Sequence, residues 1–399
     1  MDILLSETES KQFKEHILFT IAWIIVKFGS EGFKKFEKDL KLHQPATPLK
    51  IELHKTDLHP LPALNIDEST IVGNGEVDEA IVKELNLDKN PDFPEHVRVQ
   101  GGDQLSVAWL CALENIHGGQ EAGYHGFFWG AWLTGLFHRK IADTHGDLMV
   151  HWGKPNAGTQ NPGSLSFHNT RLDHLPITLT SPPPFRTCRD LIFVSLYACV
   201  LHCLLLVSNN SSLETYLSKV NSWETLLSHA HQIYDKYCQP HLVEELRWKH
   251  SVTPPSDPPQ GDMVFGNAIL FMCDALISQE FTDAIKCGDS GRVILVLKIW
   301  ALSFCGNGRT KYAYEMLTWF TTSPMSGLNL LCMWTYYFMH TIVMLTAQSI
   351  NRDIVLNNWL LNPTGNPNSW VEMDLTQEHL NFWVKVSNRS DYRTEILPT

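Results

Sequence analysis

The chain has 399 residues, of which 44% are hydrophobic, and its formal net charge at pH 7 is -12. A chain of this length and composition buries a sizeable core, which excludes an intrinsically disordered protein. The negative charge excludes a broad basic surface, so any contact with DNA is expected through a local patch.

The cysteines and the first residues indicate a cellular compartment. Nine cysteines are scattered without a CxxC pair or zinc-like spacing, which predicts reduced thiols. The start MDILLSETESKQFKEH is acidic and has no small-residue cleavage site. We therefore expect an intracellular protein, nuclear or cytoplasmic, and not a secreted one. Apolar runs at 192–207 and 328–347 lack basic flanks, so we interpret them as buried helices and expect no membrane partner.

In chain order, the first elements are helical. Residues 1–40 are predicted to form one or two helices, and the proline-containing segment 41–64 an extended connection. Another helix is expected near 77–85. We therefore predict a helical and extended N-terminal region at 1–90 and a main domain at 91–399.

The main domain opens on the segment HVRVQGGDQLSVAWL at 96–110. Val97 and Val99 alternate with polar residues, as in a half-buried strand, and two glycines then end it. Asp103 follows at the strand exit and has two interpretations. It is a metal ligand where a ribonuclease H-type nuclease places its first carboxylate, or it is the N-cap of the next helix, which the sequence alone favours.

The remaining chain is predicted to be mostly helical. We expect a mixed sheet region at 96–150, in which the aromatic segment before Gly135 is a strand and the residues after it a helix. A long loop at 153–186 and a helical portion at 187–399 follow, and Asp374 is expected to open a closing helix at 375–386. The predicted fold class is α+β, predominantly α, with a small ribonuclease H-like sheet near 96–137.

The segment GLFHRKIADTHGD at 135–147 gathers histidines and charged residues. If it is helical, Arg139 and Asp143 stand four residues apart and pair on one face. The structural interpretation is a solvated ion-pair face. The functional one places His138 and Asp143 beside Asp103 as metal ligands or an acid–base pair.

Two further carboxylates are candidates. Asp289 stands just ahead of a strongly apolar helix, and a role as N-cap explains it fully. Glu315 falls inside a helix predicted at 310–321, where it is either solvent-facing or buried and paired. It is the candidate for the last carboxylate of a ribonuclease H-type site.

Several stretches, including KTDLHPLPALNIDEST, GGDQLSVAWL and GNGRTKYAYEML, resemble a domain of unknown function that is abundant in mushroom-forming (basidiomycete) fungi. The resemblance spans most of the chain. That family has no established reaction, so it supplies no catalytic residues. Its many copies per genome imply a mobile-element origin, and transposases often insert helical material into a ribonuclease H-like core before the last glutamate.

The leading hypothesis is a transposase-like, metal-dependent nuclease or integrase relative, active or decayed, that acts on DNA phosphodiesters. Asp103, Glu315 and His138 are the expected catalytic residues. Asp103 and Glu315 would bind Mg or Mn, with Asp143 or Asp289 completing the ligand set.

The alternative is a non-catalytic, mostly helical intracellular interaction protein. In that case Asp103, Asp289 and Asp374 are all helix caps. The sequence contains no GxxxxGK[ST], GxSxG or HExxH motif, which removes the support for common kinase and hydrolase classes. It leaves the oligomeric state open.

Overall fold

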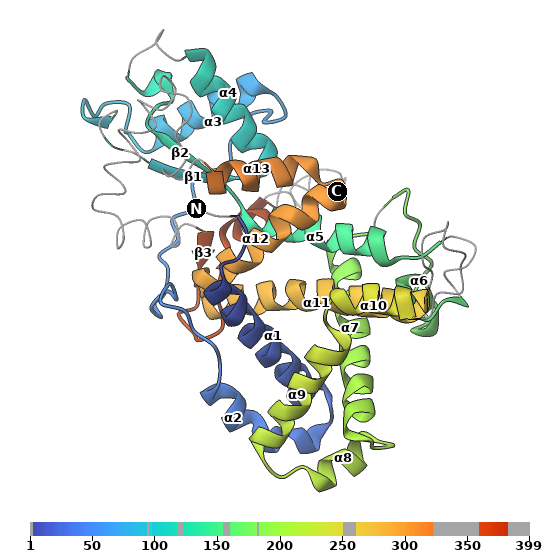
Figure 1. Ribbon diagram of the computed structural model, residues 1–399. Helices are drawn as coiled ribbons and strands as arrows, with labels where there is room; N and C mark the ends of the chain where they lie inside the picture. The colour runs from blue at the N-terminus through green and yellow to red at the C-terminus, as the bar shows by residue number, and fades with distance from the viewer. Residues whose placement is uncertain are drawn as a thin grey trace, which may run out of the picture. The chain divides into compact units, whose positions relative to one another are not determined.

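The computed structural model describes residues 3–93, 96, 98–117, 123–154, 160–181, 183–249, 261–321 and 359–381. Over these ranges the protein is mostly helical, with two small two-stranded sheets (Figure 1). The predominantly helical class is thereby confirmed. No larger sheet forms among the described residues, so the ribonuclease H-like sheet stays a hypothesis.

The chain forms two compact units, each assembled from distant segments. Unit 1 comprises Met1–Pro48, Lys140–Ala284 and Gly291–Thr321. Unit 2 comprises Leu49–Arg139, Ile285–Ser290 and Thr322–Thr399. The residues of three helices are divided between the units, namely α5 (Leu136–His151), α11 (Met263–Cys287) and α12 (Ser290–Gly306).

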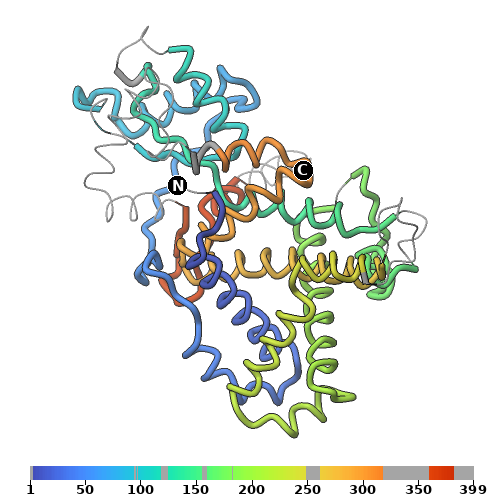
Figure 2. The backbone as a smooth tube through the Cα atoms, viewed as in Figure 1, coloured from blue at the N-terminus to red at the C-terminus, as the bar shows by residue number. Residues whose placement is uncertain are grey.

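The secondary structure of unit 1 consists of helices in its described residues. Besides the unit 1 parts of α5, α11 and α12, it contains these helices: α1 (Glu7–Phe28), η1 (Glu31–Phe36), α2 (Glu37–Leu42), α6 (Leu165–Arg171), α7 (Phe185–Ser208), α8 (Leu213–Lys219), α9 (Trp223–Tyr237), α10 (His241–Lys249) and α13 (Thr310–Thr321). Figure 2 traces α1, in blue, beside the yellow-green α9. α7 packs against both of these helices.

Local sequence signals explain how α1 begins and what it buries. The Ser6 side chain accepts a hydrogen bond from the Glu9 N–H, and the Glu9 carboxylate accepts one from the Ser6 N–H. This capping box satisfies two of the free donors at the helix start. Farther along, Ile21 and Ile24 are fully buried in a core shared with Leu196 of α7, which anchors the helix in unit 1.

Two helices are long and apolar enough to cross a membrane by length and composition. They are α7 and α11, with mean hydropathies of 2.4 and 1.2. This is weak evidence for a membrane, because the core helix of a soluble protein passes the same test. The other apolar run, at 328–347, lies outside the described residues.

Unit 2 holds both sheets. Its elements, besides the unit 2 parts of the divided helices, are α3 (Ile71–Glu84), β1 (Arg98–Gly102), α4 (Gln104–His117), η3 (Gly123–Gly126), β2 (Gly130–Thr134), β3 (Leu360–Leu361) and β4 (Val371–Glu372). β1 pairs in parallel with β2, from Arg98 opposite Gly130 to Gly102 opposite Thr134. β3 and β4 pair antiparallel, and residues 373–381 after β4 are helical.

The predicted strand and the predicted strand-to-helix turn are confirmed. β1 contains Val99 and runs through Gly101 and Gly102, which were expected to end it, while Val97 lies outside the described residues. β2 ends at Thr134, one residue before the turn at Gly135 into α5. The predicted loop at 153–186 was wrong in part, because it contains α6. Ser164 starts that helix by accepting the Phe167 N–H, and the burial of Leu165 fixes it to the core.

Asp78 of α3 supplies a test of the core of unit 2. Its side chain is 1% exposed, and one carboxylate oxygen accepts from the Gln100 side-chain amide of β1. Burial raises the pKa of Asp78 to about 6, which the hydrogen bond from Gln100 partly opposes. Because the folded state holds this proton more tightly, stability is lost as pH rises from about 4 through 6.

We predict that Asp78→Asn raises the free energy of unfolding at pH 7 by roughly 1–3 kcal/mol, because one pKa unit corresponds to about 1.4 kcal/mol. The variant should also lose the dependence of stability on pH between 4 and 6. Chemical denaturation at several pH values measures both effects. Asp57→Asn, at an exposed position, is the control. A less stable variant with an unchanged pH profile would contradict the assignment.

Candidate metal site

Helix α5 carries three metal-ligating side chains on one face. Asp143, Asp147 and His151 follow one another at intervals of four residues, and each is buried. Residues at this spacing lie on the same side of a helix. That side faces α11, which contributes Asp274 and, four residues later, Ser278. All five residues belong to unit 1.

Asp147, His151 and Asp274, which we call the Asp-His-Asp group, lie close enough together that they could hold a metal ion. One ligand atom from each lies within 4.8 Å of the other two. The closest pair is His151 Nε2 and Asp274 Oδ2, at 2.7 Å. Ligands about 2 Å from one ion stand roughly 3–4 Å apart, so an ion would draw the more distant atoms together and replace the hydrogen bond between His151 and Asp274. The Asp274 side chain is 41% exposed and has room to move.

Ser278 is shared by two buried carboxylates. Its hydroxyl donates to Asp143 Oδ2, and the same oxygen lies 3.4 Å from Asp147 Oδ2. A hydroxyl has one proton, so it satisfies one of the two carboxylates at a time. The arrangement therefore leaves acceptor capacity around the Asp-His-Asp group.

The electrostatics of the site disfavour its charged form. Burial raises the pKa of Asp143 well above its usual value, and the charge of Asp274 adds to this. Burial also raises the pKa of Asp147, as do the charges of Asp143 and Asp274. Lys140 acts on Asp143 in the opposite direction and is the smallest of the influences on it. The site is therefore short of positive charge.

A second buried ionic network in unit 1 shows how this chain neutralises acids that serve structure. The Arg292 guanidinium donates two hydrogen bonds to Glu280, each 2.7 Å long, and a third to Asp283. His16 and Thr20 of α1 also contact Glu280. These acids are paired with a cation inside the fold, which is the usual condition for burying them.

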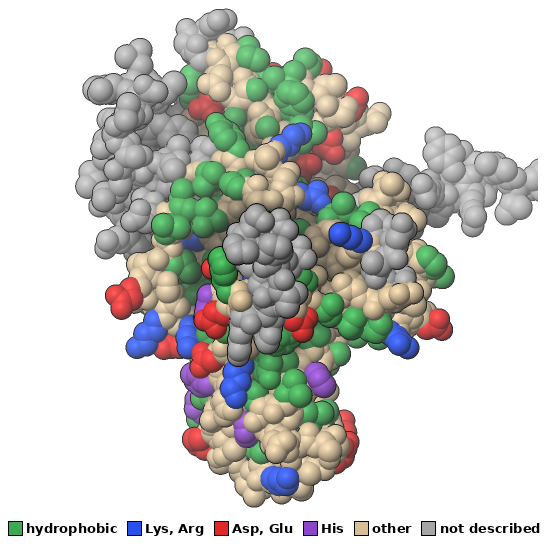
Figure 3. All heavy atoms as spheres, turned by 45° about the vertical axis from the view of Figure 1, so that its right-hand side comes forward, with side chains coloured by type: hydrophobic (Ala, Val, Ile, Leu, Met, Phe, Trp, Pro, Cys, Tyr) green, Lys and Arg blue, Asp and Glu red, His purple; other side chains and the backbone are tan. Residues whose placement is uncertain are grey.

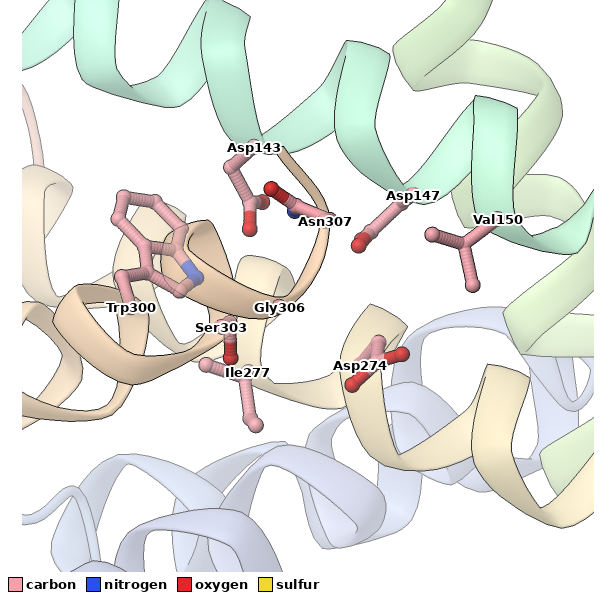
Figure 4. Close-up of a pocket in the computed structure, with 9 residues that line it drawn as sticks. All are labelled: Asp143, Asp147, Val150, Asp274, Ile277, Trp300, Ser303, Gly306 and Asn307. Carbon is pink, nitrogen blue, oxygen red and sulfur yellow. The ribbon is translucent and has the colours of Figure 1, made fainter. Parts of the chain in front are cut away.

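A pocket of about 260 Å³ adjoins the Asp-His-Asp group. Figure 4 shows its lining, in which Asp147 and Val150 project from α5 and Asp274 projects from α11. Trp300 and Ser303 of α12 form the opposite side. The other lining residues are Asp143, Ile277, Gly306 and Asn307. A cation held by the Asp-His-Asp group would therefore face a space large enough for a small molecule.

The two carboxylates expected at the centre of the nuclease site belong to different units. Asp103 is in unit 2, where its Oδ1 accepts the Ser106 N–H at 2.7 Å, as an N-cap of α4 does. Glu315 is in unit 1, half-buried on α13, and does not line the pocket.

The other predicted ligands also separate. Asp143 lines the pocket beside the Asp-His-Asp group. Asp289 is fully buried in unit 2, where its backbone forms an isolated β-bridge with Lys50 directly before α12. The predicted pairing of Arg139 with Asp143 was wrong. The Arg139 guanidinium donates to the Thr134 hydroxyl of β2, and Asp143 accepts from Ser278 instead.

His138 lies in unit 2 among carboxylates. Its Nδ1 is 3.1 Å from Asp374 Oδ2, and its Nε2 is 3.8 Å from Glu378 Oε1. The hydrogen bond to Asp374 raises the pKa of His138, and the charges of Asp374, Asp103 and Glu378 contribute. Asp103 therefore acts on His138 electrostatically, and Asp374 is its direct partner.

Asp374 differs from its predicted role. The described helix at 373–381 already includes it, so it is not the N-cap that we expected. Its carboxylate instead accepts the N–H groups of Phe137 and His138, each at 3.0 Å, and so caps α5. Gly135 permits this approach, because a Cβ there would stand 2.2 Å from the Asp374 carboxylate.

Sequence reasoning proposed none of the three members of the Asp-His-Asp group as a ligand. Asp147 and His151 follow Asp143 at intervals of four residues, so extending the helix from Asp143 to 151 would have found both. Asp274 stands in a long apolar helix with no distinguishing neighbour. Its pairing with α5 arises only from tertiary packing.

The chain belongs to the family of unknown function DUF6589, which it matches over residues 1–397. The resemblance to a family without an established reaction is thereby confirmed. No curated protein and no solved structure matches the chain. The candidate metal site therefore rests on the geometry alone.

The contact between His138 and Asp374 should depend on pH. Because the pKa of His138 is raised in the folded state, the contact stabilises fully below about 6.5 and is lost as pH rises through the raised value. Asp374→Asn should lower the pKa of His138 toward 6.5, as measured by NMR titration of its ring protons. Glu378→Gln is the control, since that longer contact should matter less. An unchanged pKa in Asp374→Asn would contradict the pairing.

Proposed function

We propose that the Asp-His-Asp group binds a divalent cation and that the protein uses this ion to hydrolyse a substrate bound in the adjacent pocket. The observation that carries the proposal is the convergence of three ligand atoms within 4.8 Å beside a pocket of about 260 Å³. A bound cation would also supply the positive charge that the buried carboxylates lack.

The ligand set favours manganese over magnesium. Carboxylates suit both ions, but an imidazole is a softer ligand that Mg²⁺ seldom takes. His151 therefore shifts the expected preference toward Mn²⁺, one of the two metals expected from the sequence. Within the proposed hydrolysis, the ion would lower the pKa of a water and polarise the bond to be cleaved.

A transposase-like nuclease that acts on DNA phosphodiesters is one of two more specific forms of this proposal. Oxygen-rich sites for Mn²⁺ or Mg²⁺ suit phosphodiester hydrolysis, and the implied mobile-element origin of the fungal family adds to this. In this form Asp143 keeps its proposed role as a ligand, and the Asp-His-Asp group supplies the others. DNA would have to bind through a local patch, because Lys and Arg side chains are scattered among acidic ones on the face in Figure 3.

A non-catalytic interaction protein is the second candidate, and the position of Asp103 favours it. That residue caps α4, which is the structural role expected if the chain has no carboxylate chemistry in unit 2. Both candidates keep the proposed intracellular location, nuclear or cytoplasmic, and the proposed absence of a membrane partner.

Metal binding by the wild-type chain tests the proposal. We expect calorimetry to show Mn²⁺ binding in unit 1, with affinity reduced more than 100-fold in Asp147→Asn and in His151→Ala. Ser278→Ala should lose only about 10- to 100-fold, the range for residues that support ligands. Asp190→Asn, at an exposed acid of the same unit, is the control. Equal affinity in all four variants would contradict the site.

Substitutions of Asp103 distinguish its role as a helix cap from a role as a metal ligand. Because Asn caps a helix almost as well as Asp, Asp103→Asn should leave the free energy of unfolding within about 0.5 kcal/mol of wild type, whereas Asp103→Ala should lower it by about 1 kcal/mol. Mn²⁺ affinity should be unchanged in both variants. Loss of Mn²⁺ binding in a stable Asp103→Asn protein would return Asp103 to the ligand set.

A further inference from the structure

One wall of the pocket consists of neutral hydrogen-bond donors from a single helix. Trp300 and Ser303 of α12 and Asn307 just after it line the pocket at intervals of three and four residues. These intervals place the side chains on one face of the helix. Figure 4 shows Trp300 and Ser303 across the pocket from Asp147 and Asp274, and Asn307 beside Asp143. We call these three side chains the donor wall.

Trp300 is the central residue of the donor wall. It is 2% exposed, and its ring packs between Phe281 and Phe304, with centroids 4.3 and 5.8 Å away. Figure 4 shows the indole nitrogen turned toward the pocket, and this N–H makes no hydrogen bond with any residue that the structure describes. An N–H that borders a pocket can donate to a group bound there, so its position suits a ligand that carries an acceptor.

Ser303 and Asn307 extend the donor wall. The Ser303 hydroxyl likewise forms no hydrogen bond within the described ranges. The Asn307 side-chain oxygen accepts the Arg309 N–H at 3.3 Å, which leaves the amide N–H₂ as the group available to a ligand. Three donors without charge thus border the same space.

Charge and volume restrict what this space accepts. Among its described lining residues there is no Lys or Arg. Apart from the proposed ion, those residues offer no cationic partner to a polyanion, so they suit an uncharged substrate better. The pocket of about 260 Å³ equals roughly nine water molecules at about 30 Å³ each, which suits a small organic molecule.

We infer that this pocket binds a small uncharged carbonyl compound, an ester or an amide, with its carbonyl oxygen against Trp300, Ser303 and Asn307. The inference rests on the proposed cation site and adds the substrate class. Water adds to the carbonyl carbon, and the π electron pair of the C=O bond moves onto oxygen. The three donors stabilise that oxyanion.

The reaction is a balanced hydrolysis. When the carbonyl re-forms, the bond from carbon to the leaving group breaks, and the leaving group departs with the electron pair and takes up the proton that the attacking water has lost. The products are a carboxylic acid and an alcohol or amine. No oxidant or reductant is consumed.

Two probes with the same leaving group test the substrate class in the full-length, Mn²⁺-loaded protein. They are p-nitrophenyl acetate, an uncharged ester, and bis(p-nitrophenyl) phosphate, an anionic phosphodiester. We expect hydrolysis of the ester that requires Mn²⁺ and disappears in Asp147→Asn, and no hydrolysis of the phosphodiester. Trp300→Phe should lower kcat for the ester about 100-fold, the effect of removing one oxyanion donor.

Controls keep the test decisive. Trp223→Phe removes another buried indole N–H in unit 1, away from the pocket, and should leave kcat unchanged. Ser303→Ala is a milder change at a half-buried position and should lower kcat even if Trp300→Phe does not fold. Calorimetry with Mn²⁺ alone, on every variant, measures the cation site independently.

Three results would overturn the inference. The first is bound Mn²⁺ without hydrolysis of the ester, and the second is cleavage of the phosphodiester in its place, which would support the nuclease. The third is unchanged kcat in both Trp300→Phe and Ser303→Ala. Failure of the wild-type protein to bind Mn²⁺ would overturn the proposed function itself, and the inference with it.

Discussion

The burial of Asp143 and Asp147 between α5 and α11 is the constraint on which the rest of the site depends. Asp143 and Asp147 are buried beside Asp274, and their direct partners there are the Ser278 hydroxyl and the His151 ring. Carboxylates in such a place either bind a proton or bind a cation. The His151 imidazole, whose Nε2 contacts Asp274, is a common metal ligand, and so the group is chemically suited to bind a cation.

Unit 1 also contains buried acids that are paired with a cation of the protein itself. Glu280 is completely buried, and Arg292 donates two hydrogen bonds to it. Arg292 donates a third hydrogen bond to Asp283. That network gains packing and rigidity from its own cation. The Asp-His-Asp group instead borders a pocket whose far wall presents Trp300 and Ser303. The buried carboxylates, the Asp-His-Asp group and the donors of Trp300 and Ser303 thus lie together in one part of unit 1.

The sequence predicted local structure well where the signal was local. The strand before Asp103, the turn at Gly135 and the helix through Asp143 all follow from alternation, glycine and helical periodicity. The favoured interpretation of Asp103 as a cap agrees with its hydrogen bond to the Ser106 N–H. These features depend on residues close together in the chain, which is why spacing reveals them.

The site itself depended on contacts that spacing does not encode. Asp274 lies 123 residues from its partner His151, and Asp374 caps a helix that begins 238 residues earlier. The expectation that Asp103 and Glu315 act together came from a fold-level analogy, and the chain places them in different units. Tertiary packing therefore decides which carboxylates share a site. Only the part of the site on α5 could have been predicted from the sequence.

The most direct measurement is the position of a bound ion. Crystals of the full-length protein grown with Mn²⁺ would be measured at the manganese absorption edge, where anomalous scattering locates the metal. The account predicts a peak about 2–2.3 Å from a nitrogen of His151 and from carboxylate oxygens of Asp147 and Asp274. A fully loaded crystal with no peak there, and His151 still bonded to Asp274, would contradict it.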